Sequence, residues 1–193
     1  AFDEYYPPGE AERVGAVDER SAILRGLGPC PAVAARLPPR LPLGTLGVHI
    51  RRADHDEARR RSPDSFFLAR LDAELSPPLH NGDGSVRVLP RCCLATDDPA
   101  LERALRARFG AERLVVLPKR SLDRERPEAI QDAFCDVLML SQCSRILGSY
   151  GSTFSAIAAL LGGAELEVVD CEPRQGAARV TPSGPCLGHD TAG

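Results

Sequence analysis

Two arginines follow directly on a short apolar run of the sequence. The run is TLGVHI, residues 45–50, and Arg51 and Arg52 come next. A guanidinium group is planar, keeps its charge, and can fork onto two oxygens of a phosphate or a carboxylate. If the run is a strand that continues through both arginines, their side chains point to opposite faces. We therefore expect at least one of them to contact an anionic ligand; the alternative is a structural ion pair with Asp54 or Asp97.

A second segment, rich in glycine and in hydroxyl groups, could receive the same anion. Residues 148–155 read GSYGSTFS and lead into an apolar stretch with helical spacing. Ser152 and Thr153 would then lie at the start of a helix, where free N–H groups and the helix dipole favour an anion. The plainer alternative is that Ser152 only caps the helix while the glycines form a tight turn. The sequence has neither GxGxxG nor GxxxxGK[ST], which disfavours NAD-type dehydrogenases and P-loop NTPases.

Two carboxylates interrupt an otherwise apolar helical segment farther along the chain. Asp132 and Asp136 are one turn apart, and like charges at that spacing repel each other. A carboxylate in such apolar surroundings needs a hydrogen-bond donor. One reading is that Asp136 accepts two N–H groups from a purine such as guanine. The other reading is a buried ion pair with one of three arginines, namely Arg51, Arg52 or Arg145.

The elements that would position these residues alternate between strand and helix. Short apolar runs predict strands at 45–50, 91–96, 113–117, 145–149 and 166–170. Helical spacing, with capping and proline signals, predicts helices at 63–75, 97–110, 126–143 and 152–163. The third of these helices has an expected core stripe that includes Ile130, Ala133 and Val137. Short strands that are apolar throughout are typical of a parallel sheet covered on both faces, so we predict a Rossmann-like α/β domain over 45–171.

The polar residues fall at one rim of this predicted sheet. Ligands of open parallel sheets bind outside the carboxyl ends of the strands. The first strand ends in Arg51 and Arg52, the second is followed by Asp97 and Asp98, and the fourth leads into 148–155. Three such clusters at one rim predict a ligand pocket there.

The two ends of the chain have a different composition. Residues 1–44 are rich in Pro, Gly, Arg and Ala and are predicted to be a linker or a remnant of an upstream domain, with a short helix near 18–26. Residues 172–193 are predicted to be a loop-like tail. Arg59, Arg60 and Arg61 are predicted to lie in a solvated loop. Because the first residue is Ala, we expect a processed chain or a fragment.

Overall composition excludes several classes of protein. The chain has 193 residues, 43% of them hydrophobic, and a formal net charge of −3, which argues against a nucleic-acid binder with a broad basic face. No apolar run approaches the length needed to span a membrane. The seven cysteines form no CxxC pair and have no histidine at ligand spacing, so we expect buried thiols and no metal site. Cys30 and Cys186 could pair.

Three segments with their spacing carry a resemblance to a known family. VHIRRAD at 48–54, CLATDDPAL at 93–101 and DAFCDVLMLSQCSRILGSYGSTFS at 132–155 resemble the GDP-fucose-dependent fucosyltransferases. That superfamily includes α1,6-fucosyltransferases, bacterial nodulation fucosyltransferases and protein O-fucosyltransferases, and the resemblance covers residues 46 to about 170. It implies that this stretch is the C-terminal, donor-binding lobe of a two-lobed GT-B glycosyltransferase. It also implies transfer of fucose from GDP-fucose with inversion and without a metal or other cofactor.

The resemblance assigns roles to individual residues. Arg51 matches the arginine of an HxR motif that holds the GDP phosphates and is essential for transfer, so it is the predicted catalytic residue. His49 belongs to the same motif, and Asp136 matches the acidic residue that contacts guanine. The predicted donor-binding residues are His49, Arg52, Asp97, Asp98, Asp136, Ser152, Thr153 and Phe154.

Several expectations about the whole protein follow from the same resemblance. The family's N-terminal lobe has no counterpart in residues 1–44, so we expect GDP binding without robust transfer by this chain alone. The acceptor would be a glycan or a protein, and any membrane anchor would lie outside this chain. The compartment would be the Golgi or ER lumen in a eukaryote and the cytoplasm in a bacterium. Two alternatives remain: a GT-B transferase that uses another nucleotide sugar, and a non-catalytic α/β interaction module or degenerate transferase lobe.

Overall fold

A computed structural model of the chain describes residues 22–24, 26, 28–38, 40–53, 55–75 and 89–172. Within them, one parallel sheet is formed by β1 (Leu46–Ile50), β2 (Cys92–Thr96), β3 (Leu114–Val115), β4 (Arg145–Ser149) and β5 (Glu165–Val169). The strands lie in the order β3-β2-β1-β4-β5. The central strands β1 and β2 are buried along their whole length, which fits the predicted sheet covered on both faces, whereas the edge strand β5 carries Glu165 and Glu167 and is largely exposed or half-buried.

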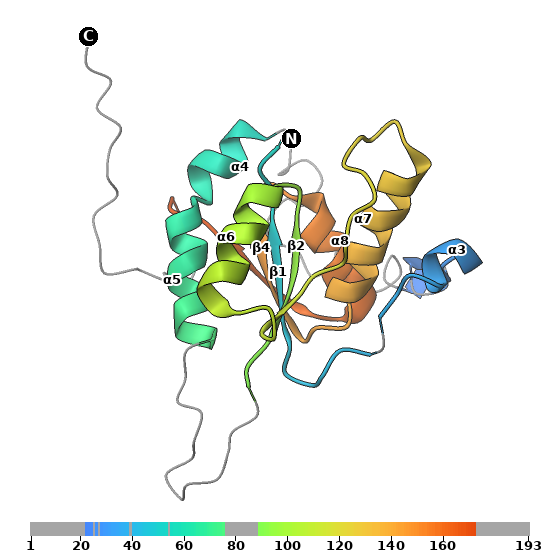
Figure 1. Cartoon of the computed structure of the whole chain (residues 1–193), viewed down its shortest axis with the longest axis horizontal. Helices are drawn as coiled ribbons and strands as arrows, with labels where there is room; N and C mark the ends of the chain where they lie inside the picture. The colour runs from blue at the N-terminus through green and yellow to red at the C-terminus, as the bar shows by residue number, and fades with distance from the viewer. Residues whose placement is uncertain are drawn as a thin grey trace, which may run out of the picture.

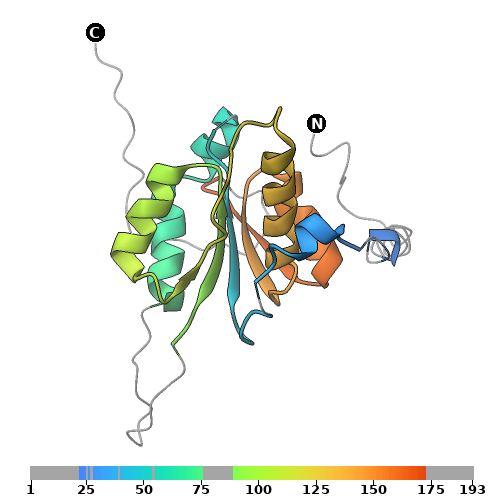
Figure 2. The same ribbon diagram turned by 45° about the vertical axis from the view of Figure 1, so that its right-hand side comes forward.

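Helices cover both faces of this sheet. They are α3 (Pro31–Ala34), α4 (Asp56–Arg61), α5 (Asp64–Leu75), α6 (Pro99–Phe109), α7 (Pro127–Leu140) and α8 (Thr153–Gly162). Figure 1 and Figure 2 show α5 and α6 on one face and α7 and α8 on the other, with α3 outside α7. The Rossmann-like α/β architecture predicted from the sequence is therefore confirmed.

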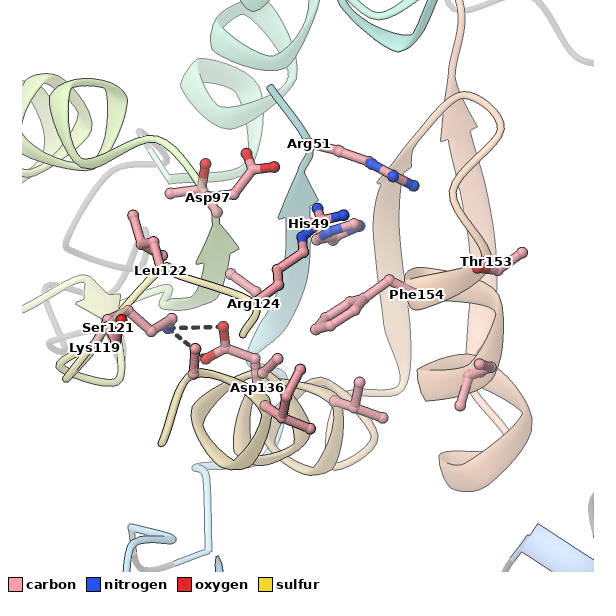
Figure 3. A pocket seen from close by; sticks show the side chains of 17 residues that line it. His49, Arg51, Asp97, Lys119, Ser121, Leu122, Arg124, Asp136, Thr153 and Phe154 are labelled. Carbon is pink, nitrogen blue, oxygen red and sulfur yellow. Dashed lines mark hydrogen bonds and ion pairs between the residues drawn. The ribbon is translucent and has the colours of Figure 1, made fainter. Parts of the chain in front are cut away.

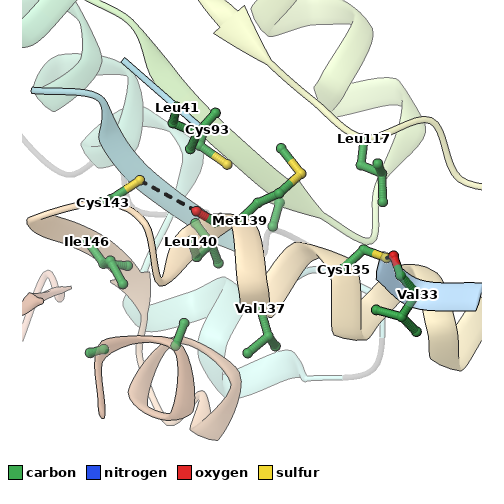
Figure 4. Packing of buried hydrophobic residues seen from close by; sticks show 13 residues of the cluster. Val33, Leu41, Cys93, Leu117, Cys135, Val137, Met139, Leu140, Cys143 and Ile146 are labelled. Carbon is green, nitrogen blue, oxygen red and sulfur yellow. Dashed lines mark hydrogen bonds between the residues drawn. The ribbon is translucent and has the colours of Figure 1, made fainter. Parts of the chain in front are cut away.

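Successive strand residues divide between the two faces. Val48 and Ile50 of β1 pack with Phe67 and Leu71 of α5 in one buried cluster. A second cluster fills the space between the sheet and the helices α7 and α8 (Figure 4). Because side chains alternate along a strand, Gly47, His49 and Arg51 belong to the α7/α8 side. His49 and Arg51 therefore lie on the side of α7 and α8, and Arg52 lies on the opposite side of the sheet.

Helix α6 begins and ends where the sequence signals indicate. The Asp98 carboxylate accepts hydrogen bonds from the N–H groups of Ala100 and Leu101, at 2.8 and 3.1 Å. Pro99 occupies the first turn, and the helix ends at Gly110. An acceptor at the N-cap, a proline in the first turn and a glycine after the last turn are the preferred terminal residues of a helix.

The direction in which successive strands are added to the sheet reverses once. The chain runs from β1 outward to β2 and β3, and then returns to place β4 on the other side of β1. Helices α5 and α6 consequently cover one face, and α7 and α8 the other (Figure 2). Ligands of such folds bind where the order reverses, outside the carboxyl ends of the central strands. In this chain the order reverses at β1, so the carboxyl end of β1 is the expected place for a ligand.

Part of the predicted N-terminal linker packs against α7. Val33 and Leu41 are buried in the α7/α8 cluster, and the Leu41 N–H donates to Gln142 Oε1 at 2.9 Å. Arg36 pairs with Asp132 of α7 at 2.9 Å. The described part of this segment therefore belongs to the packed unit. Most of the predicted helix near 18–26 and nearly all of the tail at 172–193 lie outside the described residues.

The arginine-rich segment after β1 is a helix, and the prediction of a solvated loop there is wrong. Arg61 of α4 is buried and forms an ion pair with Asp170, with Nε 3.0 Å from Oδ1. Its guanidinium carbon lies 3.6 Å from the centroid of the Tyr150 ring. The segment has little apolar periodicity, and its burial comes from this ion pair and ring contact. Asp54, which the sequence offered as an arginine partner, lies outside the described residues.

Four cysteines of the described residues are free thiols inside the packed unit. Cys92, Cys93, Cys135 and Cys143 are buried, as predicted, and pack as small hydrophobic residues. Cys186, the proposed partner of Cys30, lies outside the described residues. None of the described helices has the length and apolar character needed to cross a membrane.

Candidate functional site

A cleft of about 330 Å³ opens at the carboxyl ends of β1 and β2, on the side of the sheet covered by α7 and α8 (Figure 3). Its walls come from the strand ends, the segment after β3, residues 129–137 of α7 and the first residues of α8. The lining side chains are those of His49, Arg51, Ala95, Thr96, Asp97, Lys119, Ser121, Leu122, Arg124, Ala129, Ile130, Ala133, Asp136, Val137, Thr153, Phe154 and Ile157. A cleft therefore lies at the edge of the sheet where the sequence predicts a ligand pocket.

Arg51 follows β1 directly and is held at the backbone from both sides. The Arg51 N–H donates to Ser149 Oγ of β4 at 3.0 Å. On the other side, Asp97 accepts the N–H groups of Arg52 and Ala53, at 2.6 and 3.1 Å. Figure 3 shows the Arg51 side chain extending toward the side of the cleft that β4 and α8 form. Asp97 thus lines the cleft and also fixes the backbone that carries the arginine.

Arg52, one of the predicted donor-binding residues, is not among the residues that line the cleft. Its side chain is buried on the opposite face, where Nε donates to Asp64 Oδ1 at 2.8 Å and a terminal nitrogen donates to the Ser62 carbonyl oxygen at 2.9 Å. The guanidinium also lies over the ring of Phe67. The alternation of side chains along an extended segment separates the two arginines, and Arg52 fastens the end of β1 to α5.

His49 forms a buried floor of the cleft together with Phe154. The two rings are stacked with centroids 4.6 Å apart. Ser152 Oγ lies 3.3 Å from His49 Nδ1. Burial, followed by the charges of Arg51 and Arg52, lowers the pKa of His49 to about 3. The imidazole is therefore neutral at physiological pH and serves as a packing surface and hydrogen-bonding group.

The start of α8 presents Thr153 and Phe154 to the cleft. Gly151, with φ of 65°, makes the turn that precedes the helix. Ser152 is the N-cap residue, but its side chain makes no capping hydrogen bond and is buried toward His49. Ser152, one of the predicted donor-binding residues, is not among the residues that line the cleft. Its structural role is to support the histidine.

Asp98, also a predicted donor-binding residue, is not among the residues that line the cleft. Its carboxylate is engaged in capping α6, as described above. Of the two adjacent aspartates, only Asp97 lines the cleft.

Asp136 is a buried carboxylate on the wall formed by α7. Lys119 Nζ lies 2.7 Å from each of its two oxygens. Burial raises the pKa of Asp136 to about 6, and the charge of Lys119 opposes that shift. Asp132, one turn earlier, does not line the cleft and pairs with Arg36 and Arg120. The partner of Asp136 is therefore Lys119, and not one of the three arginines considered in the sequence analysis.

The segment after β3 supplies cleft residues that the sequence analysis did not identify. They are Lys119, Ser121, Leu122 and Arg124. The rule that ligands bind at the carboxyl ends of strands, applied to the third predicted strand, would have found them. Ile130 was expected in the core, but it is 56% exposed and lines the cleft.

The cleft has two chemically different ends. In Figure 3, Arg51 and the start of α8 lie well apart from Asp136 and Lys119. The first region offers a guanidinium and the free N–H groups of a helix N-terminus to an anion. The second offers a carboxylate to N–H donors, beside apolar side chains that include Ile130 and Val137. Among the described residues, no three His, Cys, Asp or Glu side chains are grouped so that they could hold a metal ion.

A ligand that fits both regions carries an anionic group at one end and a flat ring with N–H donors at the other. The fold defines the class of this chain as a Rossmann-like α/β domain, with a cleft at the carboxyl ends of its strands.

Comparison with known proteins gives partial structural likenesses. No family model and no curated protein matches the chain. A NodZ α-1,6-fucosyltransferase co-crystallised with GDP is 17% identical, with a TM-score of 0.39, over 76% of this chain and 41% of that one. The fucosyltransferase NodZ from Bradyrhizobium is 18% identical, with a TM-score of 0.40, over 74% and 41%. POFUT1 in its apo form is 10% identical, with a TM-score of 0.41, over 80% and 46%. The chain spans less than half the length of these structures.

Proposed function

We propose that this chain is the donor-binding domain of a fucosyltransferase and that its cleft binds GDP-fucose. The observation that carries the proposal is that Arg51, Thr153 and Asp136, which come from three distant segments, line one cleft. In this arrangement the diphosphate lies between Arg51 and the start of α8. The guanine lies against Asp136.

The diphosphate end of the proposal rests on charge and on backbone geometry. Arg51 can fork onto two phosphate oxygens. Thr153 and Phe154 at the start of α8 line the same cleft, and a helix start offers free N–H groups and the positive end of its dipole to an anion. Ser149 and Asp97 hold the backbone around Arg51, so the guanidinium starts from a fixed point. Neutral His49 adds no charge and supports the cleft through its stack on Phe154.

The base end of the proposal rests on hydrogen-bond complementarity. The guanine edge carries two adjacent kinds of donor, the N1–H and the 2-amino group, and a carboxylate is an acceptor for both. The exposed apolar side chains of Leu122 and Ile130 border this part of the cleft and can cover the flat ring.

The choice of fucose rests on the sequence motifs and is the finer part of the proposal. Two of the structurally similar NodZ crystals were prepared with GDP and with GDP-fucose. In the proposed reaction, bond breaking builds negative charge on the leaving diphosphate while the sugar becomes cationic. Arg51 stabilises that charge more in the transition state than in the ground state, as catalysis requires, without the help of a metal. A glycan or protein acceptor would bind elsewhere in the whole protein.

The first test is to titrate the chain with GDP by calorimetry and to repeat the titration with Arg51→Ala. Removing a charged hydrogen-bonding partner of a phosphate should weaken binding by about tenfold to a hundredfold. UDP should bind more weakly than GDP to the unchanged chain, because uracil lacks the 2-amino donor that Asp136 accepts.

A matched control is Arg59→Ala, which removes the same charge from an exposed position. Arg59 lies on α4 and pairs on the surface with Asp56. Its loss should change GDP affinity by no more than about twofold, because exposed charges are screened by salt. Equal weakening by both substitutions would show that only net charge matters and would contradict the proposed site.

One observation favours a second candidate, a domain that binds no nucleotide. Asp136 is already paired with Lys119, and Arg52 with Asp64, so these charges have structural partners without a ligand. In that case GDP would give no heat with the unchanged chain.

A further inference from the structure

Lys119 stands out among the cleft residues in both sequence and structure. It is the single lysine in a sequence whose other basic side chains, histidines aside, are all arginines. An ammonium group is a compact donor with three protons, whereas a guanidinium is a planar fork. The cation beside Asp136 is therefore a compact ammonium group and not a planar guanidinium.

The ammonium group is held in place by more than Asp136. Nζ donates to the Leu117 carbonyl oxygen at 3.1 Å and lies 2.7 Å from both Asp136 oxygens. The Lys119 side chain is 15% exposed and lines the cleft. The wall consequently presents a positive donor and a negative acceptor side by side, both reachable from the cleft.

Such a pair has its own preference among nucleobases. A base that approaches Asp136 with N–H donors must place an acceptor next to Lys119. Guanine does so, since its 6-oxygen adjoins the N1–H and the 2-amino group. Adenine offers an amino donor toward Lys119 and an unprotonated nitrogen toward Asp136, so both contacts are mismatched.

We propose that Lys119 is a specificity-determining residue that donates to the 6-oxygen of a purine diphosphate while Asp136 accepts the N1–H and the 2-amino group. This inference rests on the proposed function, because it presupposes that the base lies at Asp136. It adds that Lys119 turns from its ion pair toward the ligand and selects 6-oxopurines over 6-aminopurines.

Two other roles for Lys119 would give different results. Lys119 could act only through Asp136, by keeping that carboxylate ionised. It could also be a competitor that a ligand must displace. The first role would weaken every ligand of Asp136 equally when Lys119 is removed, and the second would strengthen them.

The test compares GDP with 6-thioguanosine 5′-diphosphate on the full chain at pH 7, where both bases keep the N1–H and Asp136 is mostly ionised. The thio analogue keeps the N1–H and the 2-amino group but replaces the 6-oxygen by sulfur, a weaker acceptor. The unchanged chain should prefer GDP by about tenfold. Lys119→Met should bind both ligands with affinities within about twofold of each other, because the partner of the 6-oxygen is gone. Lys119→Gln, which keeps an N–H donor without the charge, should retain part of the preference.

The outcomes separate this inference from the proposed function. No binding of GDP by the unchanged chain would overturn both. GDP binding with an unaltered preference in Lys119→Met, or tighter GDP binding by that variant, would overturn the role of Lys119 alone. Thermal unfolding of each variant checks its fold, and Lys119→Gln decides the matter if Lys119→Met does not fold.

A second measurement needs no substitution. Because the sequence has one lysine, labelling lysine with 13C at Cε gives a single NMR signal for this position. GDP should shift that signal more than the thio analogue does. Equal shifts would count against a contact with the 6-oxygen.

Discussion

His49 shows how one side chain can be held neutral beside a charged site. It is buried between Phe154 and Ser152, and two arginines follow within three residues. Burial and these charges lower its pKa from 6.5 to about 3. A proton on His49 would place a buried positive charge next to the cation that is proposed to bind phosphate. Burial of the ring disfavours this protonation, because the charged imidazole would lose its contact with water.

The lowered pKa predicts a particular dependence of stability on pH. In the unfolded chain His49 takes up a proton below about pH 6.5, whereas the folded chain resists protonation until about pH 3. His49 therefore makes the folded state lose stability as the pH falls through this window, at up to about 1.4 kcal/mol per pH unit. Between pH 6.5 and 4.5, the free energy of unfolding of His49→Gln should fall by about 2–3 kcal/mol less than that of the unchanged chain.

Asp136 acts in the opposite direction over part of the same window. Burial raises its pKa to about 6, so folding becomes more favourable as the pH falls through 6. Comparing His49→Gln with the unchanged chain by urea unfolding isolates the histidine, because Asp136 is present in both. A difference between the two proteins that stays constant from pH 7 to pH 4.5 would show that His49 titrates normally in the folded state.

At the residue scale, the sequence identifies charged residues near the cleft more reliably than the direction in which their side chains point. Arg51, Asp97 and Asp136 were identified from their places after strands or on an apolar helix, and all three line the cleft. Arg52 could not be assigned to one face until the direction of the strand end was known. Lys119 was missed because it lies in a segment without strand or helix periodicity.

At the scale of elements, the site depends on close packing between β4 and α8. A methyl group added at Gly148 would lie 2.5 Å from Ser155 Oγ and 2.9 Å from Ser155 Cβ. Only glycine allows the first turn of α8 to approach the strand this closely. That turn carries Thr153 and Phe154 into the cleft.

Gly148→Ala should therefore destabilise the chain by about 1–3 kcal/mol, the usual cost of overpacking a buried contact. It should also weaken GDP binding, since the new methyl group pushes α8 away from Arg51. Thermal unfolding and calorimetry measure the two effects. Gly28→Ala is the matched control, because nothing lies within 4 Å of its added methyl group and its backbone has no positive φ. Similar stability of both variants would contradict the close approach.

Element boundaries followed from local signals where those signals were strong. Asp98, Pro99 and Gly110 mark the ends of α6, and short apolar runs mark the strands. Helix α4 was missed because DEARRR has no apolar stripe. Its position depends on the ion pair of Arg61 with Asp170, more than one hundred residues away in the sequence, and local patterns cannot contain such information.

At the scale of the whole molecule, the sequence predicts a parallel sheet but not its order. The order β3-β2-β1-β4-β5 puts β4 beside β1 and so brings the start of α8 to the rim that carries Arg51. The close-up in Figure 3 shows side chains from β1, α7, α8 and the segment after β3 around one cleft. The central claim concerns this convergence: one end of the cleft takes a diphosphate and the other takes a base.

A crystal structure of the chain with GDP tests that claim most directly. We expect phosphate oxygens within hydrogen-bonding distance, about 3 Å, of the Arg51 guanidinium and of the first N–H groups of α8. The guanine edge should lie on Asp136 in the same molecule of ligand. GDP bound in the reverse direction, or at another place on the chain, would contradict the account.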